Sequence, residues 1–269
     1  MNLAYPNIES KVTRQFKNVG DIENLSNIIE GNLGVKSEVG VILPTYCEAA
    51  NIEKLISEIE SLKLNISILV IDDSSPDGTA DIVRSLQAKH PNILLYVRSQ
   101  KSGLGTAITD GFKVFLLLVN PPEYIVTMDA DYSHSPKDVP HVVSAAKEGK
   151  GLAIGSRYCR GGRIINWSLF RLLTSRIANL VASSVVGAKI QDYTSGLRCY
   201  STSLVKAIVN DLHSQTYEIQ IETIRQARKK EFDIKEVPIT FVNRKKGKSK
   251  LTPNEIREFI TYIVKIRNN

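Results

Sequence analysis

Short apolar runs alternate with segments of helical periodicity along most of this 269-residue chain. The apolar runs, rich in β-branched residues, fall at residues 39–43, 66–71, 93–97, 124–128 and 152–154. Segments with apolar side chains on one helical face separate them, at residues 48–62, 80–88, 105–118 and after Pro136. Because parallel strands need a crossover connection, usually a helix, this alternation predicts right-handed βαβ units. The expected fold class is α/β, with a mostly parallel sheet flanked by helices.

Two aspartates separated by one small residue follow the apolar run at 124–128. These are Asp129 and Asp131, on either side of Ala130. Loops at the carboxyl ends of parallel strands are where open α/β sheets bind ligands. Two carboxylates with no neutralising side chain before Lys137 repel each other unless a cation lies between them. Hard oxygen ligands suit Mg²⁺ or Mn²⁺, so the pattern indicates a metal site shared with substrate phosphates. A solvated turn is the alternative.

Two further polar loops follow predicted strands, at residues 44–48 and 72–79. Because the carboxyl ends of parallel strands meet at one edge of a sheet, we expect these loops and the loop at 129–133 to form one site. Asp72 and Asp73 end a strand where ribose hydroxyls or a base are commonly held, although Ser-Ser-Pro-Asp-Gly is also a strong turn sequence. Tyr46 either stacks on a base or caps its loop. His134 is expected to face solvent.

Composition limits the partners and the compartment. The net charge of +7 favours acidic partners such as nucleotides or phospholipid head groups. Three widely separated cysteines argue against a disulfide framework or a zinc site. The sequence has no uninterrupted run of about 18 apolar residues, so no transmembrane helix is predicted. The N-terminus has no apolar signal core. Residues 1–37 are polar and are predicted to form a separate extension, with one helix near residues 21–30.

The regular alternation stops after residue 154. Residues 167–187 form a predicted amphipathic helix that carries Arg171 and Arg176, for which core packing and a membrane surface are both open interpretations. A helix at 218–230, a strand at 236–242 and a final amphipathic helix at 253–267 follow. Between these last two, residues 244–250 hold five cations around Gly247. This segment is interpreted as a loop that closes over a donor, or that binds nucleic acid or anionic lipid nonspecifically.

Seven ordered motifs closely resemble the dolichyl-phosphate mannose synthases, which are family 2 glycosyltransferases with the GT-A fold. The motifs are Pro44-Thr45-Tyr46-Cys47-Glu48, Asp72-Asp73-Ser74-Ser75-Pro76-Asp77-Gly78-Thr79, Gly103-Leu104-Gly105-Thr106-Ala107, Met128-Asp129-Ala130-Asp131, Gly155-Ser156-Arg157-Tyr158, Ser195-Gly196-Leu197-Arg198 and Arg244-x-x-Gly247-x-Ser249-Lys250-Leu251. The resemblance spans residues 39–251 and leaves the N-terminal extension outside. It places a GT-A domain at residues 38–269, with interface helices at about 167–187 and 253–267.

The resemblance implies a role for each matched residue. Those that would bind the nucleotide sugar are Pro44, Tyr46, Glu48, Ile71, Asp73, Asp129, Ala130, Asp131, Arg244 and Lys250. Asp129 and Asp131 would hold Mg²⁺ or Mn²⁺. The acceptor phosphate would contact Arg157, Arg171 and Ser175, and Asp131, Arg157, Arg171 and Arg244 would be the catalytic set. The chain departs from the family at Cys47, where Asn is frequent, and at Ser133, where some members have a metal-contacting Gln. The Ser195 hydroxyl, in a predicted tight turn, is expected to need no contact.

The implied reaction transfers mannose from GDP-mannose to dolichyl or another polyprenyl phosphate. An acceptor phosphate with a second pKa of about 6 is already mostly dianionic near pH 7, so it needs no general base. Attack opposite the departing GDP would invert the anomeric centre and give a β-linked product. The expected location is peripheral, on the cytoplasmic face of a membrane, with small membrane-anchoring subunits as candidate partners. A sister transferase using UDP-glucose is the alternative; a nucleotide-binding protein without turnover is another. Nucleic acid is disfavoured, because only 7% of residues are aromatic.

Overall fold

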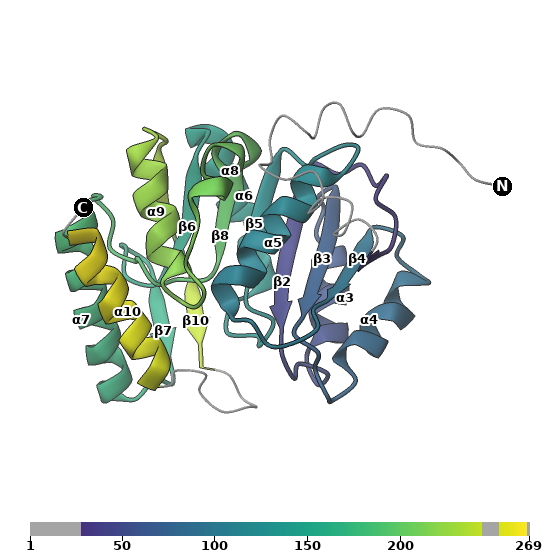
Figure 1. The fold of residues 1–269 in the computed structure, drawn as a ribbon, viewed down its shortest axis with the longest axis horizontal. Helices are drawn as coiled ribbons and strands as arrows, with labels where there is room; N and C mark the ends of the chain where they lie inside the picture. Colours follow the sequence, from purple (N-terminus) through teal and green to yellow (C-terminus); the bar gives the residue numbers. More distant parts are fainter. Residues whose placement is uncertain (1–27, 244–252, 268–269) are drawn as a thin grey trace.

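The structure, a computed structural model, describes residues 28–243 and 253–267. Within these ranges eight strands form one sheet in the order β1-β4-β3-β2-β5-β8-β6-β9 (Figure 1). The strands are β1 (Ile29–Glu30), β2 (Val39–Thr45), β3 (Ile66–Asp72), β4 (Ile93–Val97), β5 (Tyr124–Thr127), β6 (Leu152–Ser156), β8 (Arg198–Ser201) and β9 (Ile234–Pro238). The pairs β2–β3, β2–β5, β3–β4 and β6–β9 are parallel. The α/β class and the mostly parallel sheet are confirmed.

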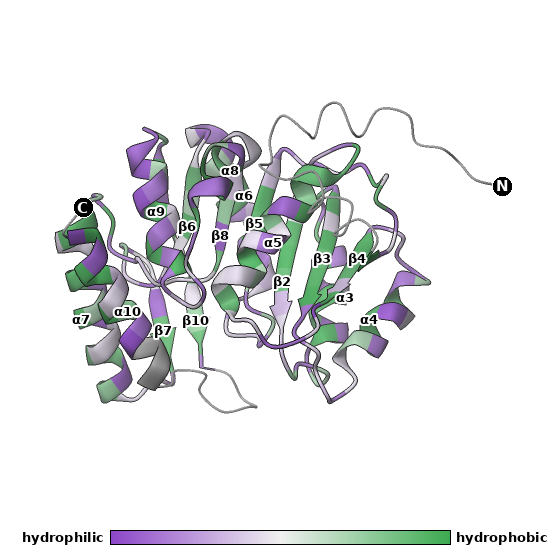
Figure 2. Cartoon of the chain, in the orientation of Figure 1, coloured by the Kyte–Doolittle hydropathy of each residue, from purple (hydrophilic) through white to green (hydrophobic). Residues whose placement is uncertain are grey.

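Helices cover both faces of this sheet. One face packs against α3 (Ile52–Glu60), α4 (Thr79–Gln87) and α6 (Val139–Gly149), and the other against α5 (Leu104–Leu117), α8 (Thr202–Ile208) and α9 (Ile219–Lys229). Alternate residues of each strand point to opposite faces, so Val41 and Leu43 join one apolar cluster and Ile42 joins the other. A strand buried on both faces is a nearly continuous apolar run, and Figure 2 shows β2 and β3 mostly in the green of hydrophobic residues.

Two strands run against the parallel direction. Strand β8 lies between β5 and β6 and is antiparallel to both. Strand β1 pairs antiparallel with β4 at the opposite edge. Ile29 and Glu30 therefore extend the sheet, whereas the sequence pattern predicts them at the end of a helix; residues 21–27 of that expected helix lie outside the described residues.

A second, two-stranded sheet and two further helices lie beside β6 and β9. Strands β7 (Arg163–Ile165) and β10 (Thr240–Val242) pair in parallel, and α7 (Leu169–Val186) packs against α10 (Pro253–Arg267) at the end of the molecule (Figure 1). The single strand expected at 236–242 is divided. Pro238 has no N–H to continue the ladder with β6, and Ile239 is buried while its N–H donates to Ser156 O at 3.0 Å. The chain then turns into the second sheet, which brings Phe241 over the carboxyl edge of the first.

Candidate active site

Asp129 and Asp131, the two aspartates predicted to hold a metal, follow β5 at the carboxyl edge of the sheet. Asp131 is buried, and its Oδ1 accepts from Ser133 N at 3.0 Å. The Asp129 side chain keeps 35% of its surface exposed, and its Oδ2 lies 3.7 Å from His134 Nδ1. Gly196 lies against this carboxylate, because a Cβ at position 196 would be 3.0 Å from Asp129 Oδ2. The chain therefore leaves one carboxylate accessible and closes the other into the loop.

The expectation that His134 faces solvent is wrong. Its side chain is fully buried beside Phe241, with the ring centroids 5.0 Å apart and the planes at 85°. Strand β10 covers this loop, because Val242 N donates to Ser133 O at 3.0 Å. Burial lowers the pKa of His134 to about 4, since a charged imidazole loses its hydration there. The imidazole is therefore neutral at pH 7, and the sequence pattern could not show a covering strand that lies more than 100 residues away.

This loop offers oxygen atoms suited to a hard divalent cation. Besides the two carboxylates, Ser133 Oγ is buried without a hydrogen-bond partner among the described residues. Within the same ranges no group of three or more His, Cys, Asp or Glu side chains is placed to hold a metal. A cation here would take two protein carboxylates and complete its shell with substrate phosphate and water oxygens, which is how Mg²⁺ is usually held. The residues present fit such an ion.

Strands β2 and β3 bring most of the predicted nucleotide residues to the same edge. Pro44 lies opposite Ile71 in the β2–β3 register. Asp73 is buried, and Arg98 donates to its Oδ1 from Nε at 2.6 Å and approaches it with Nη2 at 2.5 Å. Arg98 also donates to Gly103 O at 3.0 Å, which fixes the loop before α5. Asp73 is thus presented by an arginine that sequence analysis did not identify.

The turn chemistry expected of the 72–79 loop is also realised. Asp72 is fully buried and accepts from Thr45 Oγ1 at 2.9 Å, Ser75 Oγ at 2.6 Å and Ser75 N at 2.8 Å. It therefore stabilises the loop rather than facing a ligand. Cys47 has a φ of 59°, in the left-handed region that Asn adopts more readily than most residues. The residue type noted at this position in the resembled family suits that backbone.

Tyr46 and Glu48 flank Cys47 on this loop. The Tyr46 ring is half-buried, and Lys101 Nζ lies 4.3 Å from its centroid, within the range of a cation–π contact. Glu48 is buried and accepts from Asn51 Nδ2 at 2.9 Å, while its backbone N–H donates to Thr79 Oγ1 at 3.0 Å. The loops after β2 and β3 are joined by these bonds, so the expected convergence of the two loops is confirmed.

Arg157 follows β6 and is held by a buried carboxylate. Its Nε and Nη2 donate to Asp192 Oδ2 and Oδ1 at 2.8 and 2.7 Å, and its backbone N–H donates to Oδ2 at 2.9 Å. Nη2 also donates to Thr194 Oγ1 at 2.6 Å. Burial alone would lower the pKa of Arg157, but the Asp192 carboxylate outweighs it and raises that pKa. Burial likewise acts to raise the pKa of Asp192, and the guanidinium overcomes it, leaving that pKa below its usual range.

Aromatic rings surround Arg157 and connect it to the other two residues predicted to contact the acceptor. Its guanidinium carbon lies 5.4 Å from the ring centroids of Tyr158, Trp167 and Phe241. Arg171, on the first turn of α7, lies 4.1 Å over the Trp167 ring and donates from Nη1 to Asn243 Oδ1 at 2.7 Å. Tyr158 donates its hydroxyl proton to Ser175 Oγ at 2.8 Å. The structure therefore brings together all three predicted acceptor residues.

The Ser195-Gly196-Leu197-Arg198 motif locks the segment that carries Asp192. Arg198 is fully buried and donates to the carbonyls of Tyr193, Ser195 and Gln220. The Ser195 hydroxyl donates to Gly155 O at 2.5 Å, so the expectation that it needs no contact is wrong. A buried turn beside β6 leaves no water to satisfy this hydroxyl, which explains the bond.

Phe241 joins the two halves of the site. Its ring meets His134 edge-on at 5.0 Å, Trp167 at 5.3 Å, and the Arg157 guanidinium at 5.4 Å. The Phe241 ring is therefore packed against both the carboxylate loop (residues 129–134) and the arginine cluster, which is formed by Arg157, Arg171 and Trp167. Arg244 and Lys250, predicted to hold the donor diphosphate, lie outside the described residues.

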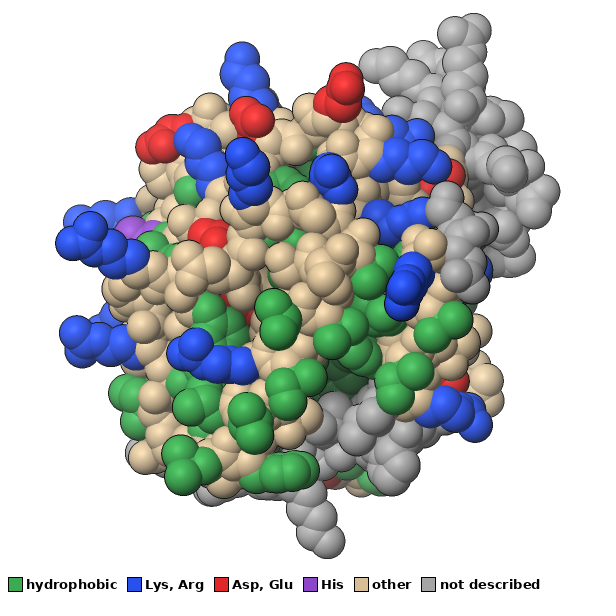
Figure 3. All heavy atoms as spheres, turned by 90° about the vertical axis from the view of Figure 1, so that its left-hand side faces the viewer, with side chains coloured by type: hydrophobic (Ala, Val, Ile, Leu, Met, Phe, Trp, Pro, Cys, Tyr) green, Lys and Arg blue, Asp and Glu red, His purple; other side chains and the backbone are tan. Residues whose placement is uncertain are grey.

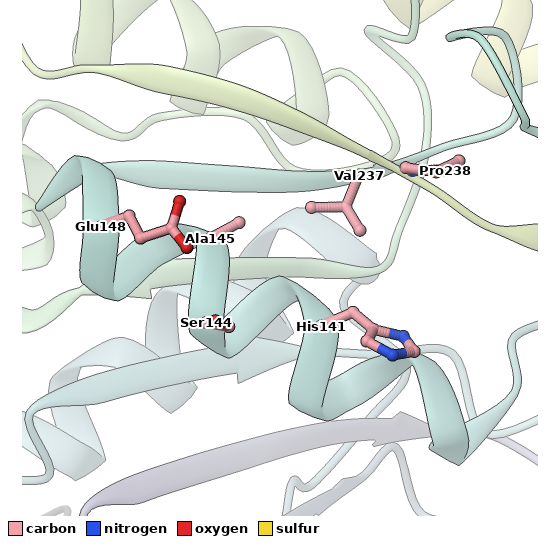
Figure 4. A pocket seen from close by; sticks show the side chains of 6 residues that line it. All are labelled: His141, Ser144, Ala145, Glu148, Val237 and Pro238. Carbon is pink, nitrogen blue, oxygen red and sulfur yellow. The ribbon is translucent and has the colours of Figure 1, made fainter.

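A separate open pocket of about 380 Å³ lies between α6 and β9, lined by His141, Ser144, Ala145, Glu148, Val237 and Pro238 (Figure 4). It contains none of the predicted site residues.

Comparison with known proteins agrees with this geometry. Residues 40–209 match the model of the glycosyl transferase family 2. The polyprenol monophosphomannose synthase of Mycolicibacterium smegmatis is 37% identical over 220 residues, covering 81% of this chain and 82% of that protein. The dolichol-phosphate mannosyltransferase of Pyrococcus furiosus is 34% identical over 233 residues, covering 85% of this chain and 63% of that protein.

Solved structures share the fold. Glucosyl-3-phosphoglycerate synthase from Mycobacterium tuberculosis, in complex with Mn²⁺, UDP-glucose and phosphoglyceric acid, superposes with a TM-score of 0.61 at 18% identity, covering 93% of this chain and 84% of that one. A mannosyltransferase from Pyrobaculum calidifontis, in complex with GDP-Man and Mn²⁺, gives 0.53 at 18% identity, covering 89% and 69%. At this identity the likeness is one of fold alone. The chain is a glycosyltransferase of family 2 with the GT-A fold.

Proposed function

We propose that this enzyme transfers mannose from GDP-mannose to a dolichyl or other polyprenyl phosphate, with inversion to a β-linked mannosyl phosphate and release of GDP. The observation that carries the proposal is the position of Phe241, which packs against His134 of the carboxylate loop on one side and against Arg157 and Trp167 on the other, while Arg171 stacks on Trp167. The names of the relatives that are 34–37% identical support the mannosyl donor and the polyprenyl phosphate acceptor.

The reaction in this site requires two anions to approach each other. The acceptor phosphate attacks the anomeric carbon as an already ionised nucleophile, so the neutral His134 need not accept a proton. Guanidinium groups suit phosphate oxygens, and because Nε and Nη2 of Arg157 donate to Asp192 and Thr194, its Nη1 together with Arg171 would hold the acceptor on the face opposite the departing GDP. The bond to the diphosphate oxygen breaks as the new carbon–oxygen bond forms, through an oxocarbenium-like transition state by analogy with other glycosyl transfer.

The donor diphosphate gains negative charge as it leaves. A divalent cation, held by Asp129 and Asp131, would supply the positive charge that stabilises this leaving group. Asp73, presented by Arg98, and the loop of Pro44, Tyr46 and Glu48 would hold the nucleoside. The Ala130 backbone, between the two aspartates in sequence, would lie near the nucleotide. We assign Arg244 and Lys250 to the diphosphate on the motif alone.

We further propose that the enzyme binds a membrane surface through α7 and α10. Figure 3 shows hydrophobic side chains gathered on the end of the molecule that these helices form. The most exposed are Leu169 (85%), Phe170 (80%) and Leu180 (72%), with Ile260 and Val264 on α10. Burying such side chains is favourable by roughly 1.5–3 kcal/mol each.

Helix α7 is, among the described residues, long and apolar enough to cross a membrane by length and composition, which the sequence pattern did not predict; 17% of it is buried. Contacts on its inner side favour a surface position instead. Asn179 is buried, donates from Nδ2 to Thr194 Oγ1 at 3.2 Å, and accepts from Tyr193 N at 2.6 Å. These bonds attach α7 to the segment that carries Asp192. A helix that crossed the membrane would have to break them and separate from that segment.

The test is transfer of radiolabelled sugar to dolichyl phosphate by purified protein with Mg²⁺ or Mn²⁺. GDP-mannose and UDP-glucose are compared, with Asp131→Ala and Arg171→Ala as site variants and Lys206→Ala, an exposed cation on α8, as the control. We expect label in lipid from GDP-mannose only, lost by about a hundredfold or more in both site variants and kept in the control. Product from UDP-glucose alone would replace the donor assignment. No lipid product from either donor would refute the proposal.

A further inference from the structure

Trp167 lies between the two arginines assigned to the acceptor phosphate. It precedes α7, and its ring has the Arg171 guanidinium at 4.1 Å and the Arg157 guanidinium at 5.4 Å from its centroid. Phe241 packs edge-on against the same ring at 5.3 Å, with the planes at 76°. The sequence motifs give this residue no role, and it is the single tryptophan of the chain.

The ring fixes the relative position of two like charges. Arg157 is immobilised by the Asp192 carboxylate from the sheet side, whereas Arg171 comes from α7 and reaches Asn243 after β10. Two guanidinium groups brought to one site repel each other, and the negative face of an indole attracts both. An arginine side chain loses much rotamer freedom when it is held in one place, so a ring that holds it beforehand lowers the cost of binding phosphate.

A second observation concerns the indole nitrogen. Trp167 Nε1 is buried and has no hydrogen-bond partner among the residues that the structure describes. Buried N–H groups are nearly always paired, and an unpaired one beside two cations is a position that an anion would satisfy. The indole N–H lies on the same ring that contacts both guanidinium groups. A phosphate bound between Arg157 and Arg171 is therefore an anion that could also accept a hydrogen bond from Trp167 Nε1.

We propose that Trp167 is a positioning residue for the acceptor phosphate, holding Arg157 and Arg171 at the separation that a phosphate monoester bridges. This inference rests on the proposed function, because the acceptor phosphate is part of that proposal. Trp167 would act on acceptor binding, because its ring contacts are with Arg157, Arg171 and Phe241.

Because Trp167 is the only tryptophan, its fluorescence reports on this site directly. Short-chain isoprenyl phosphate is titrated into the intact protein under selective tryptophan excitation, with the isoprenol of equal length and inorganic phosphate in parallel. We expect a saturable emission change with isoprenyl phosphate and none with isoprenol. An equal change with isoprenol, or none at concentrations that saturate sugar transfer, would overturn the inference. A change with inorganic phosphate alone would show that the site reads free phosphate, and would also overturn it.

Kinetics of two variants separate positioning from a general structural role. Trp167→Leu removes the ring face, and we expect the KM for the acceptor to rise about tenfold, equivalent to about 1.4 kcal/mol, with the KM for GDP-mannose within about twofold. Trp167→Phe keeps a ring face and should recover part of the loss. A parallel rise of both KM values, or an acceptor KM within about twofold of the natural enzyme, would overturn the inference. If the natural enzyme itself labels no lipid, the proposed function fails, and the fluorescence titration still decides whether Trp167 senses the phosphate.

Discussion

Replacing Asp192 with Asn should be among the most damaging single changes to this fold. The carboxylate is fully buried and accepts three hydrogen bonds from Arg157, at 2.7–2.9 Å, and one from Thr194 N at 3.2 Å. An amide keeps one acceptor oxygen and points an NH₂ group at a guanidinium that is 6% exposed. Breaking a buried ion pair from one side costs about 3–5 kcal/mol, because the remaining charge stays buried. We expect that loss in the free energy of unfolding, a large share of the roughly 5–15 kcal/mol typical of a domain.

The assay is urea-induced unfolding followed by circular dichroism, at equal protein concentration and neutral pH. Asp81→Asn is the matched control, because Asp81 pairs with Arg84 at 2.7 Å with an 80% exposed side chain. That exposed pair should contribute no more than about 1 kcal/mol. A double-mutant cycle that adds Arg157→Met isolates the pair, and the double variant should recover much of the stability that Asp192→Asn loses. A cost for Asp192→Asn no greater than that of the control, or no recovery in the cycle, would refute the reasoning.

Three further outcomes follow from the described contacts. The folded-state pKa of Asp192 lies below its unfolded value of about 3.9, so the stability that its charge contributes is present above that pH and is lost as the pH falls through the folded value. The difference in free energy of unfolding between the natural enzyme and Asp192→Asn should therefore shrink below about pH 4. A difference that stays constant with pH would contradict this. Leu169→Asp with Phe170→Ser should lower sedimentation with anionic liposomes more than tenfold (about 1.5–3 kcal/mol per side chain) while transfer to a short soluble acceptor persists, and unchanged liposome binding would exclude α7 as the contact. Gly105→Ala places a Cβ 2.2 Å from Ser214 O, so unfolding in urea should show a loss of about 1–3 kcal/mol, whereas an unchanged midpoint would mean that this loop moves freely.

Local pattern was sufficient to predict the strands β2 to β6 and the edge at which their loops meet, but not the antiparallel strands β1 and β8. The alternation of apolar runs with helical faces depends on neighbours in sequence, and the structure confirms it from β2 to β6. Since parallel strands present their carboxyl ends together, Asp129, Pro44 and Ile71 could be placed at one edge without coordinates. Continuous apolar periodicity at 236–242 predicts one strand, whereas the change of sheet depends on Pro238 and on Ser156, which is far away in sequence.

The partners of the charged residues could not be predicted in the same way. Asp192 lies 35 residues from Arg157, in a segment whose sequence carries no periodic signal. Arg98 lies 25 residues from Asp73, and its position after a predicted strand does not indicate which carboxylate it binds. His134 has polar neighbours in sequence and becomes buried only because β10 crosses it. Each of these depends on tertiary packing, which a single sequence does not reveal.

The position of Phe241 has a thermodynamic consequence for how the two substrates bind. One ring packs against His134 in the carboxylate loop and against Trp167 and Arg157 in the arginine cluster. Protein interiors are close-packed, so a displacement on one side of that ring must be accommodated on the other. For the proposed donor and acceptor, any coupling that this ring transmits must be reciprocal, so the donor would change acceptor affinity by the same factor as the acceptor changes donor affinity. Strand β10 thus joins the two halves of the candidate site through a single side chain.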